Sequence, residues 1–224
     1  MNPTPIDPLS HPIAFLTVYL AADNFDLEEQ VRTIVNLIAV AWAIHIVNWG
    51  FGRGALNWVF GIRSRQLSGI IGIVTAHFLH SVRRDDTPNK NSHIVGNTIG
   101  FLFLGFLVAI QGLKLFYVVS IIAALISGLG TWLFGRDDAP HVGASGVLFG
   151  YIGFLIIYGI VSRNLFAFLA GAAGLFIFQT NFIGVVGILP GQAGMSWEGH
   201  LFGFIGGVFA AYLIGYAMLN YIPG

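Results

Sequence analysis

The sequence predicts an all-α polytopic membrane protein, a bundle of six transmembrane helices. Hydrophobic residues make up 56% of its 224 residues and charged residues only 9%, against roughly 45–50% and 25% in ordinary soluble domains. The mean hydropathy is +0.79. Apolar residues also gather into segments of about 20, the length that a helix needs to cross about 30 Å of hydrocarbon. Because backbone groups in lipid must be hydrogen-bonded internally, these segments are predicted to be helices.

Six segments meet this length requirement. They are residues 34–51, 92–111, 115–134, 142–162, 165–182 and 197–221. Residues 1–32 are predicted to form a short N-terminal tail, whose apolar stretch 13–22 is too short to span and is interpreted as an interfacial helix. Residues 33–224 then form a six-helix membrane domain.

Two of the connecting loops have unusual sequences. The first, residues 52–91, carries six Lys or Arg residues and an apolar stretch, 67–79, that is too short to cross a bilayer. We expect this loop to lie partly in the membrane surface. The loop 181–196 contains no charge and several helix-breaking Gly and Pro residues. It is predicted to act as a gate next to the membrane.

Composition excludes several functional classes. Ten basic and ten acidic residues give a net charge of +0, so nothing indicates a nucleic-acid partner. Cysteine is absent, which excludes disulfides, thiol catalysis and thiolate metal sites. A metal site at His77, His80 and His93 is a minor alternative, and no metal or other cofactor is predicted. His45, with Asn48 near it, is interpreted as an interhelical hydrogen-bonding residue.

Polar residues inside apolar segments are informative, because hydrocarbon makes them costly unless they are paired or functional. Ser145 lies in a Gly-Ala-Ser-Gly motif at the start of the fourth segment, and His200 lies at the start of the sixth. His93 and Asn97 lie four residues apart at the start of the second. If every segment crosses the membrane, these three helices begin on the same side. The four residues therefore share one depth.

Together these residue types suit acyl transfer. A serine hydroxyl becomes a good nucleophile when a neighbouring base takes its proton, and imidazole is the usual base near neutral pH. Ser145 and His200 are predicted to form such a pair. His93 and Asn97 share one helical face by their spacing, so they can stabilise the anion that develops on an attacked carbonyl, together with backbone N–H groups near Ser145.

Glycines explain how the fourth and sixth helices can approach each other. Two small-residue stripes allow close backbone contact, and they consist of Gly146 and Gly150 in the fourth segment and Gly199, Gly203 and Gly207 in the sixth. The structural alternative is that Ser145 is only a small packing residue and His200 only a polar tie between helices. The coincidence of the polar residues at one depth favours catalysis.

Three motifs carry a family resemblance. Gly143-Ala144-Ser145-Gly146, His200 through Gly207 and His93 through Asn97 resemble the GxSG, HxxGxxxG and HxxxN patterns of the rhomboid intramembrane serine proteases, in matching helices. The resemblance covers residues 34–221, including the long first loop. It implies a Ser-His dyad without an aspartate, which cleaves peptide bonds in or next to the transmembrane segments of other membrane proteins.

The resemblance also implies a role for each matching residue. Ser145 is the nucleophile and His200 the base, while His93, Asn97 and the Ser145 backbone amide form the oxyanion hole. Phe149 lies where many relatives have a tyrosine packed on the histidine. The supporting glycines are Gly143, Gly146, Gly203 and Gly207.

Partners and location follow from this resemblance. The expected partners are transmembrane segments of single-pass or multi-pass proteins and the lipid bilayer. The expected location is a prokaryotic plasma membrane, with the active site opening to the extracytoplasmic side. A count of Lys and Arg by side, three against seven, would instead place the first loop in the cytoplasm. The family arrangement is preferred because the loop arginines can cap helices or bind lipid phosphate.

Two other functions are alternatives to proteolysis. A catalytically inactive rhomboid-like protein that binds transmembrane helices is the main alternative, although a pure binder needs neither the serine nor the histidine. A transporter is disfavoured because the two halves of the chain show no internal repeat. The glycine stripes are accounted for by packing within one chain, so the sequence does not decide the oligomeric state.

Overall fold

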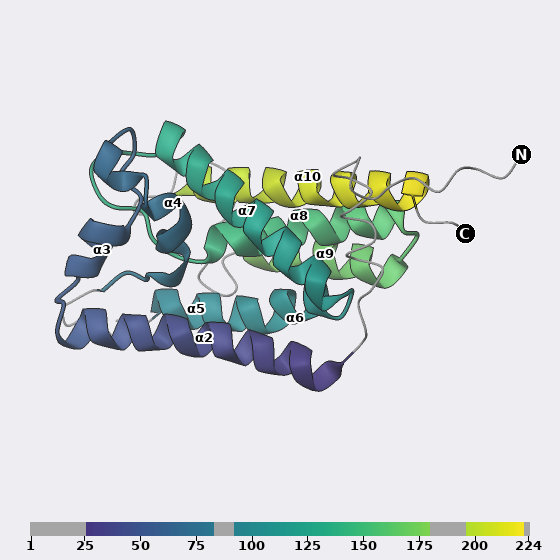
Figure 1. The fold of residues 1–224 in the computed structure, drawn as a ribbon, viewed down its shortest axis with the longest axis horizontal. Coiled ribbons are helices and arrows are strands. Elements are labelled where there is room, and N and C mark those ends of the chain that lie inside the picture. Colours follow the sequence, from purple (N-terminus) through teal and green to yellow (C-terminus); the bar gives the residue numbers. More distant parts are fainter. Residues whose placement is uncertain (1–25, 83–91, 180–195, 222–224) are drawn as a thin grey trace, which may run out of the picture.

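The computed structural model describes residues 26–82, 92–179 and 196–221, and this part of the chain is helical with no β-strand. Long helices lie roughly along one direction and α7 crosses them diagonally (Figure 1). The long helical elements are α2 (Leu27–Gly50), α5 (Ser92–Gly100) with a π-helical segment (Phe101–Gly105) and α6 (Phe106–Ala109), α7 (Leu113–Phe134), α8 (Ser145–Val161), α9 (Leu165–Gln179) and α10 (Trp197–Tyr221). The first loop contains α3 (Ala55–Phe60), η1 (Leu67–Gly69), α4 (Gly72–Thr75) and η2 (Ala76–Phe78).

The first long helix starts earlier than predicted. Asp26 is its N-cap, and the Asp26 carboxylate accepts hydrogen bonds from the backbone N–H groups of Glu28 (3.0 Å) and Glu29 (3.2 Å). The predicted start at residue 34 was wrong because it followed the apolar run, whereas a capped helix continues through exposed charged residues. The predicted interfacial helix 13–22 lies outside the described residues, as does nearly all of the predicted gate 181–196.

Within the described residues, three helices are long and apolar enough to cross a membrane: Leu27–Gly50, Leu113–Phe134 and Trp197–Gly215. The other predicted spans form shorter apolar helices, namely His93–Ala109, Ser145–Val161 and Leu165–Ile177. The predicted fourth segment, residues 142–162, starts three residues before α8 does. Gly143 has φ +128°, which a helix does not accommodate, so α8 begins only at Ser145. The all-helical architecture is confirmed, and the count of six crossings stays a prediction.

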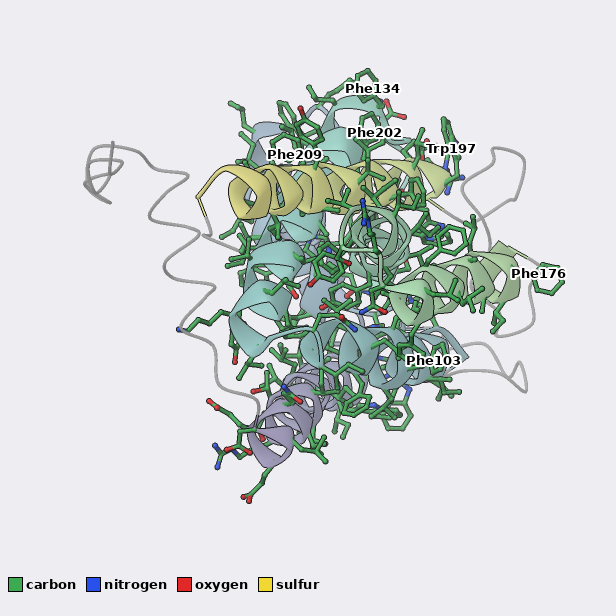
Figure 2. All side chains as sticks on the ribbon, turned by 90° about the vertical axis from the view of Figure 1, so that its right-hand side faces the viewer. Phe103, Phe134, Phe176, Trp197, Phe202 and Phe209 are labelled. Atoms are coloured by element: carbon green, nitrogen blue, oxygen red, sulfur yellow. The ribbon has the colours of Figure 1, made fainter. Side chains whose placement is uncertain are left out.

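Helix α8 forms the centre of the bundle, in contact with α7, α9 and α10. Phe149, Tyr151 and Phe154 are fully buried along it. Apolar side chains also cover the outside, where Phe176 of α9 is 70% exposed and Phe209 of α10 is 50% exposed (Figure 2). An apolar core with an apolar exterior is what a helical protein surrounded by lipid requires.

The first loop is folded against the end of α7. The Arg65 backbone N–H donates to the Trp132 carbonyl (2.8 Å), and its guanidinium Nη1 donates to the Gly135 carbonyl (2.8 Å). Trp132 Nε1 donates in return to the Gln66 carbonyl (2.9 Å). Arg65 therefore caps the C-terminus of α7, one of the two roles expected for the loop arginines. The loop also exposes apolar side chains, including Leu67 at 84%, and its location in the membrane surface stays a prediction.

Glycines let α8 and α10 touch backbone to backbone. A Cβ atom added at Gly203 would overlap the Gly146 carbonyl oxygen, and one at Gly207 would overlap the Gly150 carbonyl oxygen. The two predicted glycine stripes therefore lie against each other in the structure. Since backbone cannot move aside as a flexible side chain can, no larger residue fits without separating the helices.

Gly203→Ala tests this contact. We expect it to lower the free energy of unfolding in detergent micelles by about 1–3 kcal/mol, because the added methyl forces α8 and α10 apart. The matched control is Gly50→Ala, since nothing lies within 4 Å of a Cβ at Gly50. Equal stability of the two variants, measured by denaturant titration, would show that the close approach is not needed.

Candidate active site

Ser145 is the first residue of α8 and is half-buried. The loop before it is held in place because the Gly143 N–H donates to the Ala76 carbonyl of η2 (3.0 Å). Gly143 needs its positive φ of +128° to make this turn, which favours glycine. The first loop therefore contributes directly to the position of the serine.

His200 lies in the first turn of α10 and is only 3% exposed. Its Nε2 atom is 2.8 Å from Ser145 Oγ. One face of the imidazole stacks on the ring of Phe149, with ring centroids 4.5 Å apart and an interplanar angle of 23°. The stacking holds the ring plane, so Nε2 stays directed at the hydroxyl and can accept its proton.

A serine of α7 secures the start of α10. The buried Ser127 hydroxyl donates to the Gly199 carbonyl oxygen (2.8 Å), one residue before His200. A Cβ at Gly146 would overlap Ser127 Oγ, so α7, α8 and α10 meet at this point. Sequence reasoning missed Ser127, because a hydroxyl in an apolar helix gives no signal of its tertiary partner.

His93 and Asn97 of α5 lie next to the loop before the serine. A Cβ atom at Gly143 would be 2.9 Å from His93 Nε2 and 3.9 Å from Asn97 Nδ2. The backbone N–H of Ser81 donates to His93 Nδ1 (3.3 Å), so the neutral ring carries its hydrogen on Nε2, the atom near Gly143. Asn97 Nδ2 donates to the His93 carbonyl (2.8 Å), which leaves a second amide hydrogen.

Ser145, His200, His93 and Asn97 therefore gather at the same end of the bundle. The Ser145 hydroxyl lies within hydrogen-bond distance of the His200 imidazole. The N–H donors of His93 and Asn97 lie next to Gly143. This combination can support nucleophilic attack on a carbonyl and stabilise the resulting oxyanion.

Three histidines, His45, His80 and His93, also lie one next to another beside the site. The His80 ring lies between those of His93, at 5.4 Å between centroids, and His45, at 6.3 Å. His77 Nε2 instead contacts the carbonyl oxygens of Ile73 (3.1 Å) and Ala124 (3.0 Å). In the described part of the chain, no three His, Asp or Glu residues are grouped closely enough to hold a metal ion.

Asn48, which lies near His45 in α2, hydrogen-bonds to the first loop. Asn48 Nδ2 donates to Asn57 Oδ1 of α3 (2.9 Å), and Asn57 Nδ2 donates to the His80 carbonyl (3.1 Å). These buried amides connect α2 to the first loop. Asn57 was not identified from the sequence, because its partners are distant in the chain.

The apolar helical fold indicates an integral membrane protein. A family model of the Rhomboid domain matches residues 70–217. The chain is similar to uncharacterized protein Rv1337 of Mycobacterium tuberculosis, with 34% identity over 187 residues that cover 81% of this chain and 74% of that protein. It is also similar to uncharacterized protein ML1171 of Mycobacterium leprae, with 36% identity over 187 residues that cover 81% and 70%.

The chain belongs to the rhomboid family, whose members are generally serine proteases. The matched region extends from the first loop into α10, so it includes every predicted site residue.

Ser127→Ala tests the contact that secures His200. We expect the free energy of unfolding to fall by about 1 kcal/mol, because the substitution removes a buried hydrogen bond. Ser162→Ala is the control, since the exposed Ser162 hydroxyl bonds only within its own helix turn, and a change within about 0.5 kcal/mol is expected there. Equal losses in the two variants would contradict a role for Ser127.

Proposed function

We propose that this protein is an intramembrane serine endopeptidase, which hydrolyses peptide bonds in or next to the transmembrane segments of membrane proteins. The observation that carries the proposal is the 2.8 Å separation between His200 Nε2 and Ser145 Oγ at the start of two helices in backbone contact. Membership of the rhomboid family supports the same chemistry.

The mechanism uses the dyad twice. Ser145 Oγ attacks the substrate carbonyl carbon while its proton passes to His200 Nε2. The carbonyl oxygen becomes an oxyanion that accepts hydrogen bonds from His93, Asn97 and the Ser145 backbone N–H. His200 then protonates the leaving amine as the peptide C–N bond breaks. Water, deprotonated by His200, finally releases the acyl group from Ser145.

Substrates are proposed to be helical segments that can unwind. The carbonyl of an intact helix is already hydrogen-bonded and hidden, so a substrate must expose its scissile bond locally. Helix-breaking residues and a small side chain near that bond favour cleavage.

The proposed setting is a bacterial plasma membrane crossed six times, with the site opening to the extracytoplasmic side. The mycobacterial origin of the similar proteins supports a bacterial membrane. The Lys and Arg count favours a cytoplasmic first loop, but Arg65 caps α7 and so has a structural role in that loop. An arginine with such a role is weaker evidence for a cytoplasmic location, which supports the proposed orientation.

The dyad is tested by cleavage of a transmembrane reporter and by labelling with a fluorophosphonate, which reacts with activated serines. The purified native chain is expected to show both. Ser145→Ala and His200→Ala are each expected to lower the cleavage rate by at least about 10³-fold, and Asn97→Ala by about 10²–10³-fold.

Ser162→Ala is the control for this experiment, with an unchanged rate expected. Normal folding of each variant is checked by its unfolding transition. If the folded native chain neither cleaves several reporters nor reacts with the fluorophosphonate, the inactive helix-binding alternative replaces the proposal.

The orientation is tested by cysteine labelling, which is simple because the chain has no native cysteine. Asp138 lies exposed in the loop between α7 and α8, at the end of the bundle that carries Ser145. We expect Asp138→Cys to react with a membrane-impermeant maleimide in intact cells. Ser162→Cys, at the other end of α8, is expected to react only after lysis, and the reverse pattern would overturn the orientation.

A further inference from the structure

A cavity of about 290 Å³ lies behind the candidate active site. Residues of α2, the first loop, α5, α7 and α8 line it, whereas neither Ser145 nor His200 does. Its wall includes Ile94 and Thr98 of α5 and Phe101 of the π-helical segment that follows. The cavity therefore excludes the dyad itself, although Asn97, which is assigned to the oxyanion hole, is part of its wall.

The mouth of the cavity is apolar and exposed. It includes Val74 of α4, 60% exposed, and Ile121 and Leu125 of α7, 58% and 45% exposed. Leu37 and Ile38 of α2 line the cavity opposite them. Since α2 and α7 are both long and apolar enough to cross a membrane, a mouth between them faces hydrocarbon rather than water.

Two buried polar side chains in the cavity wall have unmet hydrogen-bonding capacity. His80 and Asn97 are each 2% exposed. Both ring nitrogens of His80, and Oδ1 of Asn97, lack a well-formed hydrogen bond within the described residues, and the Phe78 carbonyl interacts with the His80 ring only weakly. Buried polar atoms are nearly always paired, and leaving one unpaired costs about 1–3 kcal/mol. An occupant of the cavity can supply the missing partners.

The charge state of His80 restricts the chemistry of that occupant. Burial, together with the neighbouring imidazoles of His93 and His45, lowers the pKa of His80 to about 3. The ring is therefore neutral at pH 7 and presents one N–H donor and one acceptor nitrogen. Asn97 Oδ1 presents a further acceptor.

A hydroxyl group pairs with two of these three atoms, because it can accept from the His80 N–H and donate to Asn97 Oδ1. A carboxylate cannot donate to Asn97 Oδ1, and no cation lines the cavity to compensate its charge. A plain hydrocarbon leaves both polar side chains unpaired. The volume is near the lower limit of small-molecule sites, about 300 Å³, which suits one slender chain.

We infer that the cavity binds a neutral single-chain amphiphile from the bilayer. Its hydroxyl lies between His80 and Asn97, and its hydrocarbon chain leaves between α2 and α7. The site is distinct from the proposed dyad, so binding does not depend on proteolysis.

The inference is tested by photolabelling the full chain in phosphatidylcholine nanodiscs. The probe is 1-decanol with an aliphatic diazirine in its chain, and labelled residues are mapped by mass spectrometry. We expect labelling at the mouth, at Val74, Ile121 or Leu125, and at least about fivefold less with an excess of unmodified 1-decanol. An equal excess of decane or decanoate is expected to compete poorly.

Two variants distinguish the cavity from the general lipid surface. Ile121→Trp fills the mouth and is expected to reduce labelling at Val74 and Leu125 at least fivefold. Ile160→Trp is the matched control, because Ile160 is also 58% exposed but lies outside the cavity. His80→Phe keeps a ring of similar shape without its nitrogens and is expected to remove the preference for decanol over decane.

Several results would overturn the inference. These are labelling spread evenly over the apolar surface, equal competition by decanol and decane, or equal labelling of the Ile121→Trp and Ile160→Trp proteins. Any of them would mean that lipid contacts the surface non-specifically, or that water alone fills the cavity. Ser145→Ala is expected to label normally, so loss of proteolysis and loss of binding are separate results.

Discussion

The structure depends on the backbone contact between α8 and α10. Gly146 and Gly203 bring the two helices so close that a Cβ atom on Gly203 would overlap the Gly146 carbonyl oxygen. Without this approach, Ser145 and His200 could not be 2.8 Å apart, because each lies in the first turn of its helix. Lipid supplies no hydrophobic force between helices, so packing and hydrogen bonds such as that from Ser127 must hold them together.

The first loop extends this arrangement to the rest of the site. It is anchored at one side by Arg65, which caps α7, and at the other by the amide pair of Asn48 and Asn57. From this folded platform, the Ala76 carbonyl holds Gly143 and the Ser81 N–H sets the tautomer of His93. The first loop therefore helps to position both Ser145 and the proposed oxyanion hole.

Helix α5 separates two environments that share Asn97. On one side its amide lies next to Gly143, and on the other the residue lines the cavity between α2 and α7. His80 likewise lies against His93 and lines the same cavity. An amphiphile bound there would contact Asn97 of the proposed oxyanion hole and His80 next to His93.

The sequence alone determined the all-helical apolar class and the two glycine stripes. It also predicted the candidate site residues His93, Asn97, Ser145, Phe149 and His200. Hydrophobicity and motif spacing are local properties, so they can be read without the fold. Helix limits were less predictable: Asp26 extends α2 and Gly143 delays α8, and both effects depend on backbone geometry. Only the tertiary structure decided the partners of Ser127, Asn57 and Arg65, and the cavity with its unpaired His80. These contacts join residues distant in the chain, and whether a buried polar atom is paired is settled only when the helices pack.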